Sequence, residues 1–165
     1  MKYVTIEDCV RFIFDVALEA DPTEKTPDYA LNKTGMKRLN GILLNVHHQW
    51  YRGTFEKAAY LFVGINKGHV FINGNKRLSL VITLAFLYRN GASHREQISR
   101  RAYKAWIGQY FPDYKISKKS FRKPYAWAFY HLNKAVADDT RHSFDELKQA
   151  VQDFLKMSMS LRKKN

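Results

Sequence analysis

Residues 68–77 are Gly68-His69-Val70-Phe71-Ile72-Asn73-Gly74-Asn75-Lys76-Arg77, and a strongly apolar segment follows them without a break. From Lys76 to Asn90 that segment is apolar on nearly every side of a helical projection, which predicts a long, buried helix. Asn90-Gly91 is a typical left-handed end for such a helix. We therefore expect residues 68–77 to form a loop that leads into the central helix of the fold.

Helical periodicity continues on both sides of this loop. Apolar side chains at helical spacing predict further helices over residues 5–18, 39–46, 54–63, 95–110, 124 onward and 143–161. Capping-box patterns begin two of them, at Thr5–Asp8 and Ser143–Glu146, and Asp21-Pro22 ends the first. Residues 47–53 are compatible with a short β-hairpin flap. The predicted fold is all-α, a helical bundle around a buried central helix.

The composition is that of one soluble domain. The chain has 165 residues, 45% of them hydrophobic, so it can bury a sizeable core. Its single cysteine, Cys9, excludes an internal disulfide, and we expect this residue to be buried. The sequence shows neither a signal-peptide pattern nor an apolar run of about 20 residues, so we expect a cytoplasmic protein without a membrane partner.

The charge is strongly positive and unevenly distributed. Lys and Arg number 28 against 15 Asp and Glu, a net charge of +13, and residues 92–165 contribute +9 of it. This excess favours a polyanionic partner such as a nucleotide, a nucleic acid or an acidic protein. Aromatic and basic side chains are interleaved in residues 92–165, which is a general nucleic-acid pattern. Their helical spacing favours core packing or partner docking instead, and we place nucleic acid second.

The loop before the long helix has the composition of an anion-binding site. Free N–H groups and the helix dipole favour an anion at a helix N-terminus. Gly74 permits a positive φ there, and Asn75 can cap the helix. Lys76 and Arg77 add positive charge. His69 is then best placed to act as a general base, because histidine exchanges protons near neutral pH. The alternative is a basic loop whose polar side chains only satisfy backbone groups.

Three other positions bear on this loop. We expect the ring of Phe71 to point inward and fix the loop to the core. Lys67 is placed either to contact a phosphate or to lie exposed at a helix end. His47 and His48 do not form a zinc site, because adjacent histidines point apart on a helix and no nearby acid or cysteine completes the ligand set.

Seven positions of residues 68–77 match the signature of a known family, His-x-Phe-x-(Asp/Glu/Asn)-(Gly/Ala)-Asn-(Gly/Lys)-Arg. They are His69, Phe71, Asn73, Gly74, Asn75, Lys76 and Arg77. The chain resembles the Fic/Doc family over residues 1–91. The resemblance implies a Fic/Doc-like catalytic core there and gives no guidance beyond it. The basic and aromatic residues at helical spacing in residues 92–165 predict a helical extension packed on the same domain. Lys76 replaces a glycine and Leu80 a second arginine of typical Fic enzymes, so the chain is most similar to the Doc (death-on-curing) toxin branch.

The resemblance implies a Doc-like protein phosphotransferase. In that branch the γ-phosphate of ATP passes to a Ser or Thr hydroxyl of a target protein, and elongation factor Tu is the known family target. Such a toxin implies an acidic antitoxin as a second partner. By resemblance, His69 would deprotonate the hydroxyl, and Lys76 and Arg77 would stabilise the phosphoryl oxygens. The segment from His47 to Gly53 falls where relatives carry a flap that binds the target as an added strand.

The same motif implies the nucleotide and metal ligands. The residues that would bind ATP are Asn73, Gly74, Asn75, Lys76 and Arg77. Asn73 occupies the position of the metal-binding acid in many relatives. An amide oxygen without charge implies that Mg²⁺ binds more weakly than it would with Asp.

Two other functions fit these residues. A Fic-type AMP transferase would use His69 in the same way despite Lys76. A catalytically silent nucleotide- or RNA-binding module would keep the loop without turnover. Transfer assays with ATP labelled in the γ- or the α-phosphate separate these functions from phosphate transfer.

Overall fold

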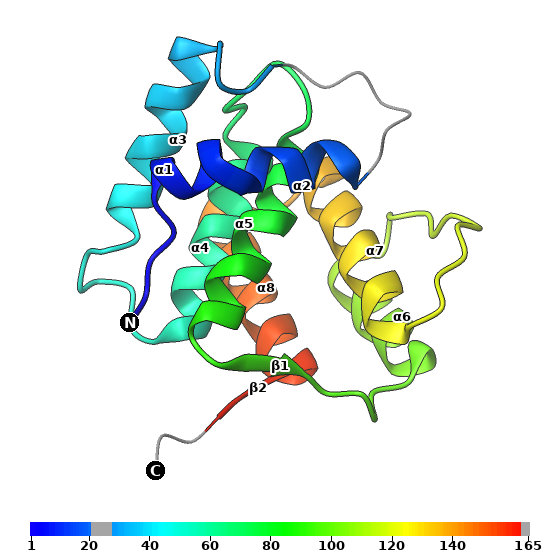
Figure 1. The fold of residues 1–165 in the computed structure, drawn as a ribbon. Coiled ribbons are helices and arrows are strands. Elements are labelled where there is room, and N and C mark those ends of the chain that lie inside the picture. Colours follow the sequence, from blue (N-terminus) through cyan, green and yellow to red (C-terminus); the bar gives the residue numbers. More distant parts are fainter. Residues whose placement is uncertain (21–27, 163–165) are drawn as a thin grey trace.

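The computed structural model describes residues 1–20 and 28–162, and most of these residues are helical, which confirms the predicted fold class (Figure 1). The helices are α1 (Ile6–Asp8), α2 (Phe14–Glu19), α3 (Lys33–Asn45), α4 (Thr54–Lys67), α5 (Asn75–Arg89), α6 (Arg100–Tyr110), α7 (Pro124–Asp138) and α8 (Phe144–Ser158), and a π-helical turn, Cys9–Ile13, joins α1 to α2. Two short strands are β1 (Ala92–His94) and β2 (Met159–Leu161). The helix end predicted at Asp21-Pro22 lies outside the described residues. Within the described part of the chain, no helix has the length and apolar character needed to cross a bilayer.

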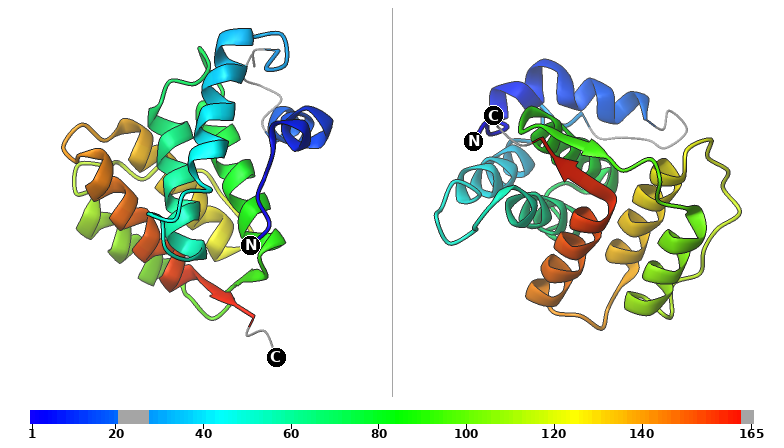
Figure 2. Two further views of the ribbon diagram at one scale, coloured as in Figure 1. Left: turned by 90° about the vertical axis from the view of Figure 1, so that its left-hand side faces the viewer. Right: turned by 90° about the horizontal axis from the view of Figure 1, so that it is seen from below.

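Helix α4 lies at the centre of the bundle. Its residues from Lys57 to Asn66 are all buried, and α3, α5, α7 and α8 pack against it (Figures 1 and 2). The sequence pattern indicated α5 as the central helix instead. Helix α5 buries Leu78 and Ile82, but its Leu80 and Leu84 are only partly buried. The apolar residues of α5 are therefore divided between the core and a surface pocket, and α4 takes the central place.

Turns occupy residues 47–53, the segment for which the sequence suggested a β-hairpin. The buried side chain of Lys57 accounts for these turns, because its Nζ donates hydrogen bonds to the backbone oxygens of Val46 and His48, the latter at 2.9 Å. The described strands pair elsewhere. β1 and β2 are antiparallel, with Ser93 opposite Ser160, and they hold the end of α8 beside the end of α5 (Figure 2).

The N-terminal helical segment packs on α5 and is tied to its C-terminal end by an ion pair. The predicted Thr5–Asp8 capping box is present. The carboxylate of Asp8 also accepts two hydrogen bonds from the guanidinium of Arg89, at 2.5 and 3.0 Å. Cys9 is buried, as predicted, and this burial raises the pKa of its thiol to about 12. The thiol is therefore not a nucleophile at neutral pH.

The aromatic side chains of residues 92–165 contribute to the core. Tyr103, Phe111, Trp127 and Phe129 are among the buried ones. Helix α8 packs on α4, α7 packs on α5, and α6 covers α7. This packing supports the interpretation that these rings stabilise the fold rather than form an exposed platform for bases.

The Asp8–Arg89 pair should affect the acid stability of the protein. The hydrogen bond from Arg89 holds the pKa of Asp8 at about 2, below its usual value of 3.8. Because the folded state depresses this pKa, the pair stabilises the fold above pH 3.8, and the stabilisation is lost as the pH falls toward 2. We expect Asp8→Asn to lower the melting temperature at pH 7 and to lose less further stability than the wild type between about pH 4 and about pH 2.

Thermal melts across this pH range test the prediction. Asp15→Asn, at an exposed position of α2, is the control and should behave as the wild type. Equal acid losses in the wild type and in Asp8→Asn would contradict the assigned role of the pair.

Candidate active site

The ring of Phe71 fixes the loop of residues 68–74 to the core. Its side chain is 3% exposed, and its ring centroid lies 4.9 Å from that of Tyr29 and 6.3 Å from that of Phe14, edge-on to both. The ring also lies against the backbone of Gly35 in α3, where a β-carbon would come within 2.3 Å of Cδ1 of Phe71. The predicted inward orientation of Phe71 is confirmed. A residue larger than glycine at position 35 would collide with this ring.

The side chain of Asn75 closes the same loop. Its Oδ1 accepts a hydrogen bond from the backbone N–H of Phe71 at 2.9 Å, and its Nδ2 donates to the backbone oxygen of Phe71 at 2.7 Å. The prediction that Asn75 caps the helix is wrong, because Gly74 is the N-cap and Asn75 is the first residue of α5. Since Gly74 has no side chain, it gives the first amide groups of α5 no capping hydrogen bond. Such a helix start suits an anion.

Gly74 adopts the left-handed conformation predicted from the sequence, with a φ of +75°. The hydroxyl of Tyr29 donates a hydrogen bond to the backbone oxygen of Gly74 at 3.2 Å. A β-carbon on Gly74 would lie 2.2 Å from that hydroxyl oxygen. Tyr29 thus contacts both Phe71 and Gly74. The sequence analysis missed Tyr29, because nothing near it in the sequence points to a residue 45 positions away.

His69 is exposed on the loop and has an unusual backbone conformation. Its φ of +44° is the only positive value at a non-glycine residue of the described chain. Nη1 of Arg38, in α3, donates a hydrogen bond to the backbone oxygen of His69 at 3.1 Å. Backbone conformations of this kind cost free energy and gather at functional sites. Arg38 therefore acts on the position of His69, a role that the sequence analysis missed.

The remaining predicted residues lie at the same junction of loop and helix. Asn73 and Lys76 are exposed, and Arg77 is partly buried in the first turn of α5. The backbone oxygen of Lys76 accepts hydrogen bonds from Ser79 at 2.8 Å and from Asn133 at 2.6 Å. Two cations at a helix N-terminus oppose the helix dipole, so a bound anion would stabilise this arrangement.

The start of α5 forms part of a pocket of about 340 Å³ between α5 and α7. Lys76 and Arg77 line this pocket, as does Leu80 one turn further along α5. Lys119 and Lys134 line it from the connector before α7 and from α7 itself. No carboxylate is among the lining residues that the structure describes, so the pocket favours an anionic ligand.

Asn133 joins α7 to both of the helices that flank the loop. Its amide donates to the backbone oxygen of Lys76, and its Oδ1 and backbone oxygen accept hydrogen bonds from Asn66 of α4, at 2.5 and 3.1 Å. Both asparagine side chains are buried. Buried amides that are hydrogen-bonded specify one arrangement of the helices around them. The helix α7 is thereby held in register with the start of α5.

Residues 23–87 match the model of the Fic/DOC family. This Fic/DOC segment contains the whole loop and also Tyr29, Gly35 and Arg38, which fix the loop from α3 and from the residues before it. Neither the curated proteins nor the solved structures gave a match. The match supports the predicted Fic/Doc family over this segment, and this family suggests a transferase that acts on protein hydroxyls. It ends before residues 92–165, so α6, α7 and α8 lie outside the matched segment.

Lys67, at the end of α4 in the Fic/DOC segment, does not point to a phosphate site. Its Nζ donates hydrogen bonds to the backbone oxygens of Ala137, at 3.2 Å, and Asp139, at 2.6 Å. These oxygens lie at the C-terminus of α7, where a cation also interacts favourably with the helix dipole. Lys67 therefore stabilises the end of α7. It is neither the phosphate contact nor the exposed lysine that the sequence suggested.

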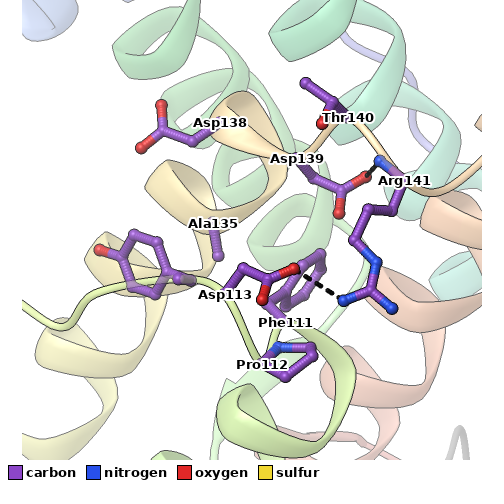
Figure 3. A pocket seen from close by; sticks show the side chains of 9 residues that line it. Phe111, Pro112, Asp113, Ala135, Asp138, Asp139, Thr140 and Arg141 are labelled. Atoms are coloured by element: carbon purple, nitrogen blue, oxygen red, sulfur yellow. Dashed lines mark hydrogen bonds and ion pairs between the residues drawn. The ribbon is translucent and has the colours of Figure 1, made fainter.

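A second, smaller pocket of about 130 Å³ lies at that end of α7 and has the opposite charge character (Figure 3). Asp113 and Asp139 face Arg141, whose Nη1 lies 2.7 Å from Oδ2 of Asp113. Asp139 also accepts hydrogen bonds from the backbone N–H of Arg141 and from His142. These carboxylates make the pocket unsuitable for a phosphate.

The loop offers a single weak metal ligand. Among the described residues, no group of three or more His, Cys, Asp or Glu side chains is placed to hold a metal ion. Asn73 is exposed and supplies an amide oxygen. Mg²⁺ prefers oxygen ligands and commonly takes most of them from phosphates and water. The residues therefore fit Mg²⁺ that arrives with a nucleotide rather than a preformed protein site.

Truncation of Phe71 should loosen the whole loop. Because the ring is buried against Tyr29, Phe14 and Gly35, we expect Phe71→Ala to lower the free energy of unfolding by about 3 to 5 kcal/mol. Ile72→Ala is the matched control, since Ile72 is the next residue and is 91% exposed. It should change the free energy of unfolding by less than about 0.5 kcal/mol. Denaturant unfolding measures both, and an equal effect of the two substitutions would contradict the packing assigned to Phe71.

Proposed function

We propose that the protein is a Doc-like phosphotransferase that moves the γ-phosphate of ATP to a Ser or Thr hydroxyl of a target protein. One observation carries the proposal. The loop that Phe71 fixes to the core exposes His69. At the start of the helix that follows, Lys76 and Arg77 line a pocket that favours an anion. A base accessible to a protein hydroxyl and cations accessible to a nucleotide are the two requirements of this transfer.

The chemical step follows from these positions. The imidazole of His69 accepts the proton of the target hydroxyl, and the hydroxyl oxygen attacks the γ-phosphorus of ATP. The bond from that phosphorus to the β–γ bridging oxygen breaks, and ADP leaves. Lys76 and Arg77 stabilise the negative charge that shifts to the phosphoryl and bridging oxygens. Gly74 and Asn75 shape the helix start against which the phosphates bind.

Leu80 supports transfer of the terminal phosphate over transfer of AMP. It lines the same pocket as Lys76 and Arg77, one helical turn further on. Typical Fic enzymes carry an arginine there, so this chain presents an apolar side chain where those enzymes hold outer phosphates. Lys76 adds a positive charge at a position where they have a glycine. Both differences favour phosphates that gather at the loop end of the pocket.

ATP and Mg²⁺ are the proposed cofactors. Bound Mg²⁺ would neutralise part of the phosphate charge, with the amide oxygen of Asn73 as its protein ligand. Asn73 to Arg77 would bind the phosphates through backbone amides and the two cations.

The proposed biological role is that of a toxin neutralised by an acidic antitoxin, with elongation factor Tu as the candidate target in the cytoplasm. The net charge of +13 supports an acidic protein partner. In this proposal residues 1–91 supply the catalytic core, and residues 92–165 are an extension packed on the same domain. The packing of α7 on α5 and of α8 on α4 supports that arrangement.

Replacement of His69 should remove transfer without unfolding the protein. The side chain is exposed, so His69→Ala leaves the core intact, and loss of a general base lowers the rate by about two to four orders of magnitude. Gln97→Ala, at an exposed position between β1 and α6, is the control and should transfer at the wild-type rate. The measurement is label incorporation into the target from γ-labelled ATP. Wild-type turnover by folded His69→Ala would exclude His69 as the base.

Lys76 and Leu80 together should favour transfer of phosphate over transfer of AMP. We expect Lys76→Gly to reduce phosphate transfer sharply, because a cation is lost where charge shifts in the transition state. The substitution should not create AMP transfer, because Leu80 still holds the outer phosphates poorly. Mass spectrometry of the modified target gives the answer: an adduct of one phosphate from the wild type supports the proposal. An adenylyl adduct would overturn it in favour of the AMP transferase, and no adduct with either label would favour the silent binding module.

A further inference from the structure

Two stretches of the C-terminal half contain basic residues and no acidic residue. Residues 97–112 carry Arg100, Arg101 and Lys104. Residues 114–137 carry Lys134 and a group of basic residues in the connector before α7. The folded chain brings the start of α6 and the end of this connector together.

Helices α6 and α7 lie side by side and begin at the same end of the bundle, near the two strands (Figures 1 and 2). The guanidinium of Arg100, the first residue of α6, donates a hydrogen bond to the backbone oxygen of Phe121 at 2.6 Å. Its Cζ also lies 5.7 Å from the ring centroid of Trp127, in the first turn of α7. These contacts tie the two helix starts to each other.

Five exposed cations lie at this junction, and we call them the α6–α7 basic surface. They are Arg100, Arg101, Lys104, Arg122 and Lys123. Neither helix has an acidic residue in its first turn. Lys123 lies 3.8 Å from Glu96, but both of these side chains are more than half exposed, so the pair neutralises little charge.

The fold itself does not use most of this charge. Within the described part of the chain, the side chains of Arg101, Lys104 and Arg122 form neither an ion pair nor a hydrogen bond. None of the five cations lines the pocket between α5 and α7. Because like charges repel at such a surface, a polyanion that binds there would relieve the repulsion.

The nonpolar side chains around the surface indicate what kind of polyanion fits. Residues 95–143, all of which the structure describes, expose no large apolar side chain. Protein interfaces usually have an apolar or aromatic centre, so an acidic protein is a poor match for this surface. Single-stranded nucleic acids stack their bases on exposed rings, but Tyr103 and Trp127 are buried here. A duplex presents closely spaced phosphates and keeps its bases paired, so cations alone are sufficient to bind it.

We propose that the α6–α7 basic surface binds the phosphate backbone of a nucleic-acid duplex without reading its sequence. The proposal goes beyond the transfer reaction and does not depend on it. The sequence pattern combined basic and aromatic residues, and the structure separates them. The rings of residues 92–165 pack inside, whereas these cations are exposed and free to contact phosphates.

Fluorescence anisotropy with a labelled duplex of about 20 base pairs tests the proposal on the full chain. Contacts from about four of the cations predict that affinity falls about a hundredfold between about 50 and about 200 mM NaCl. The double variant Arg101→Ala/Lys104→Ala should weaken duplex binding at least about tenfold and reduce the salt dependence by about two phosphate contacts. The charge-preserving variant Arg101→Lys/Lys104→Arg should bind as the wild type.

The matched control removes two exposed cations from another helix. Lys33→Ala/Lys37→Ala, in α3, causes the same loss of net charge and should leave duplex binding unchanged. Arg122→Ala/Lys123→Ala removes the connector side of the surface and should weaken binding as the α6 variant does. Circular dichroism and thermal melting establish that each variant is folded, and the connector variant serves if the α6 variant is not.

The ligands compared in the assay separate the alternatives. Duplex DNA and duplex RNA of one length are both measured; binding of either supports the proposal, and the tighter of the two identifies the source of the phosphates. Tighter binding of the single strand would indicate base stacking and overturn it. Poly-L-glutamate that binds this surface more tightly than a duplex would assign the surface to an acidic protein instead. Unchanged duplex affinity in the folded α6 and connector variants, or an equal loss in the α3 control, also overturns the proposal. The assay needs neither ATP nor turnover, so its result is independent of the proposed phosphate transfer.

Discussion

The ring of Phe71, held between Phe14, Tyr29 and the backbone of Gly35, determines where the loop of residues 68–74 can lie. Asn75 binds both backbone polar groups of Phe71, so the start of α5 follows the position of this one residue. The loop is therefore shaped by apolar packing and amide hydrogen bonds. The exposed side chain of His69 has no part in that packing.

Two features of the junction are unfavourable by themselves. His69 has a positive φ, and Lys76 and Arg77 place cations at the positive end of a helix dipole. The buried ring of Phe71 and the hydrogen bond from Arg38 maintain the loop despite these costs. Strained backbone conformations and unfavourably placed charges that the rest of a fold maintains are expected at functional sites. A phosphate at the helix start would turn the second of them into a favourable interaction.

Local patterns were predictable from the sequence, and contacts between distant residues were not. The capping boxes at Thr5 and Ser143 depend on residues three positions apart, and both are present. The motif that contains His69 and the left-handed Gly74 were likewise found, because their signals are contiguous. By contrast, the Asn66–Asn133 contact joins residues 67 positions apart. That α4 and not α5 is the central helix depends on which face of α5 lines a pocket. No periodicity distinguishes an apolar face in a core from one in a pocket wall.

The pocket explains why α5 is apolar on more sides than its core contacts require. Leu78 and Ile82 face the core, whereas Leu80 and Leu84 face the pocket, where apolar surface left exposed to water would lower stability unless a ligand covers it. The opposite wall comes from residues outside the Fic/DOC segment and is fixed to it by the hydrogen bond from Asn133 to the backbone oxygen of Lys76. Since α8 of the same extension covers the central helix α4, the extension contributes to the core and to the pocket at once. A change in these C-terminal helices can therefore alter the ligand that the pocket accepts while the phosphate-binding loop stays as it is.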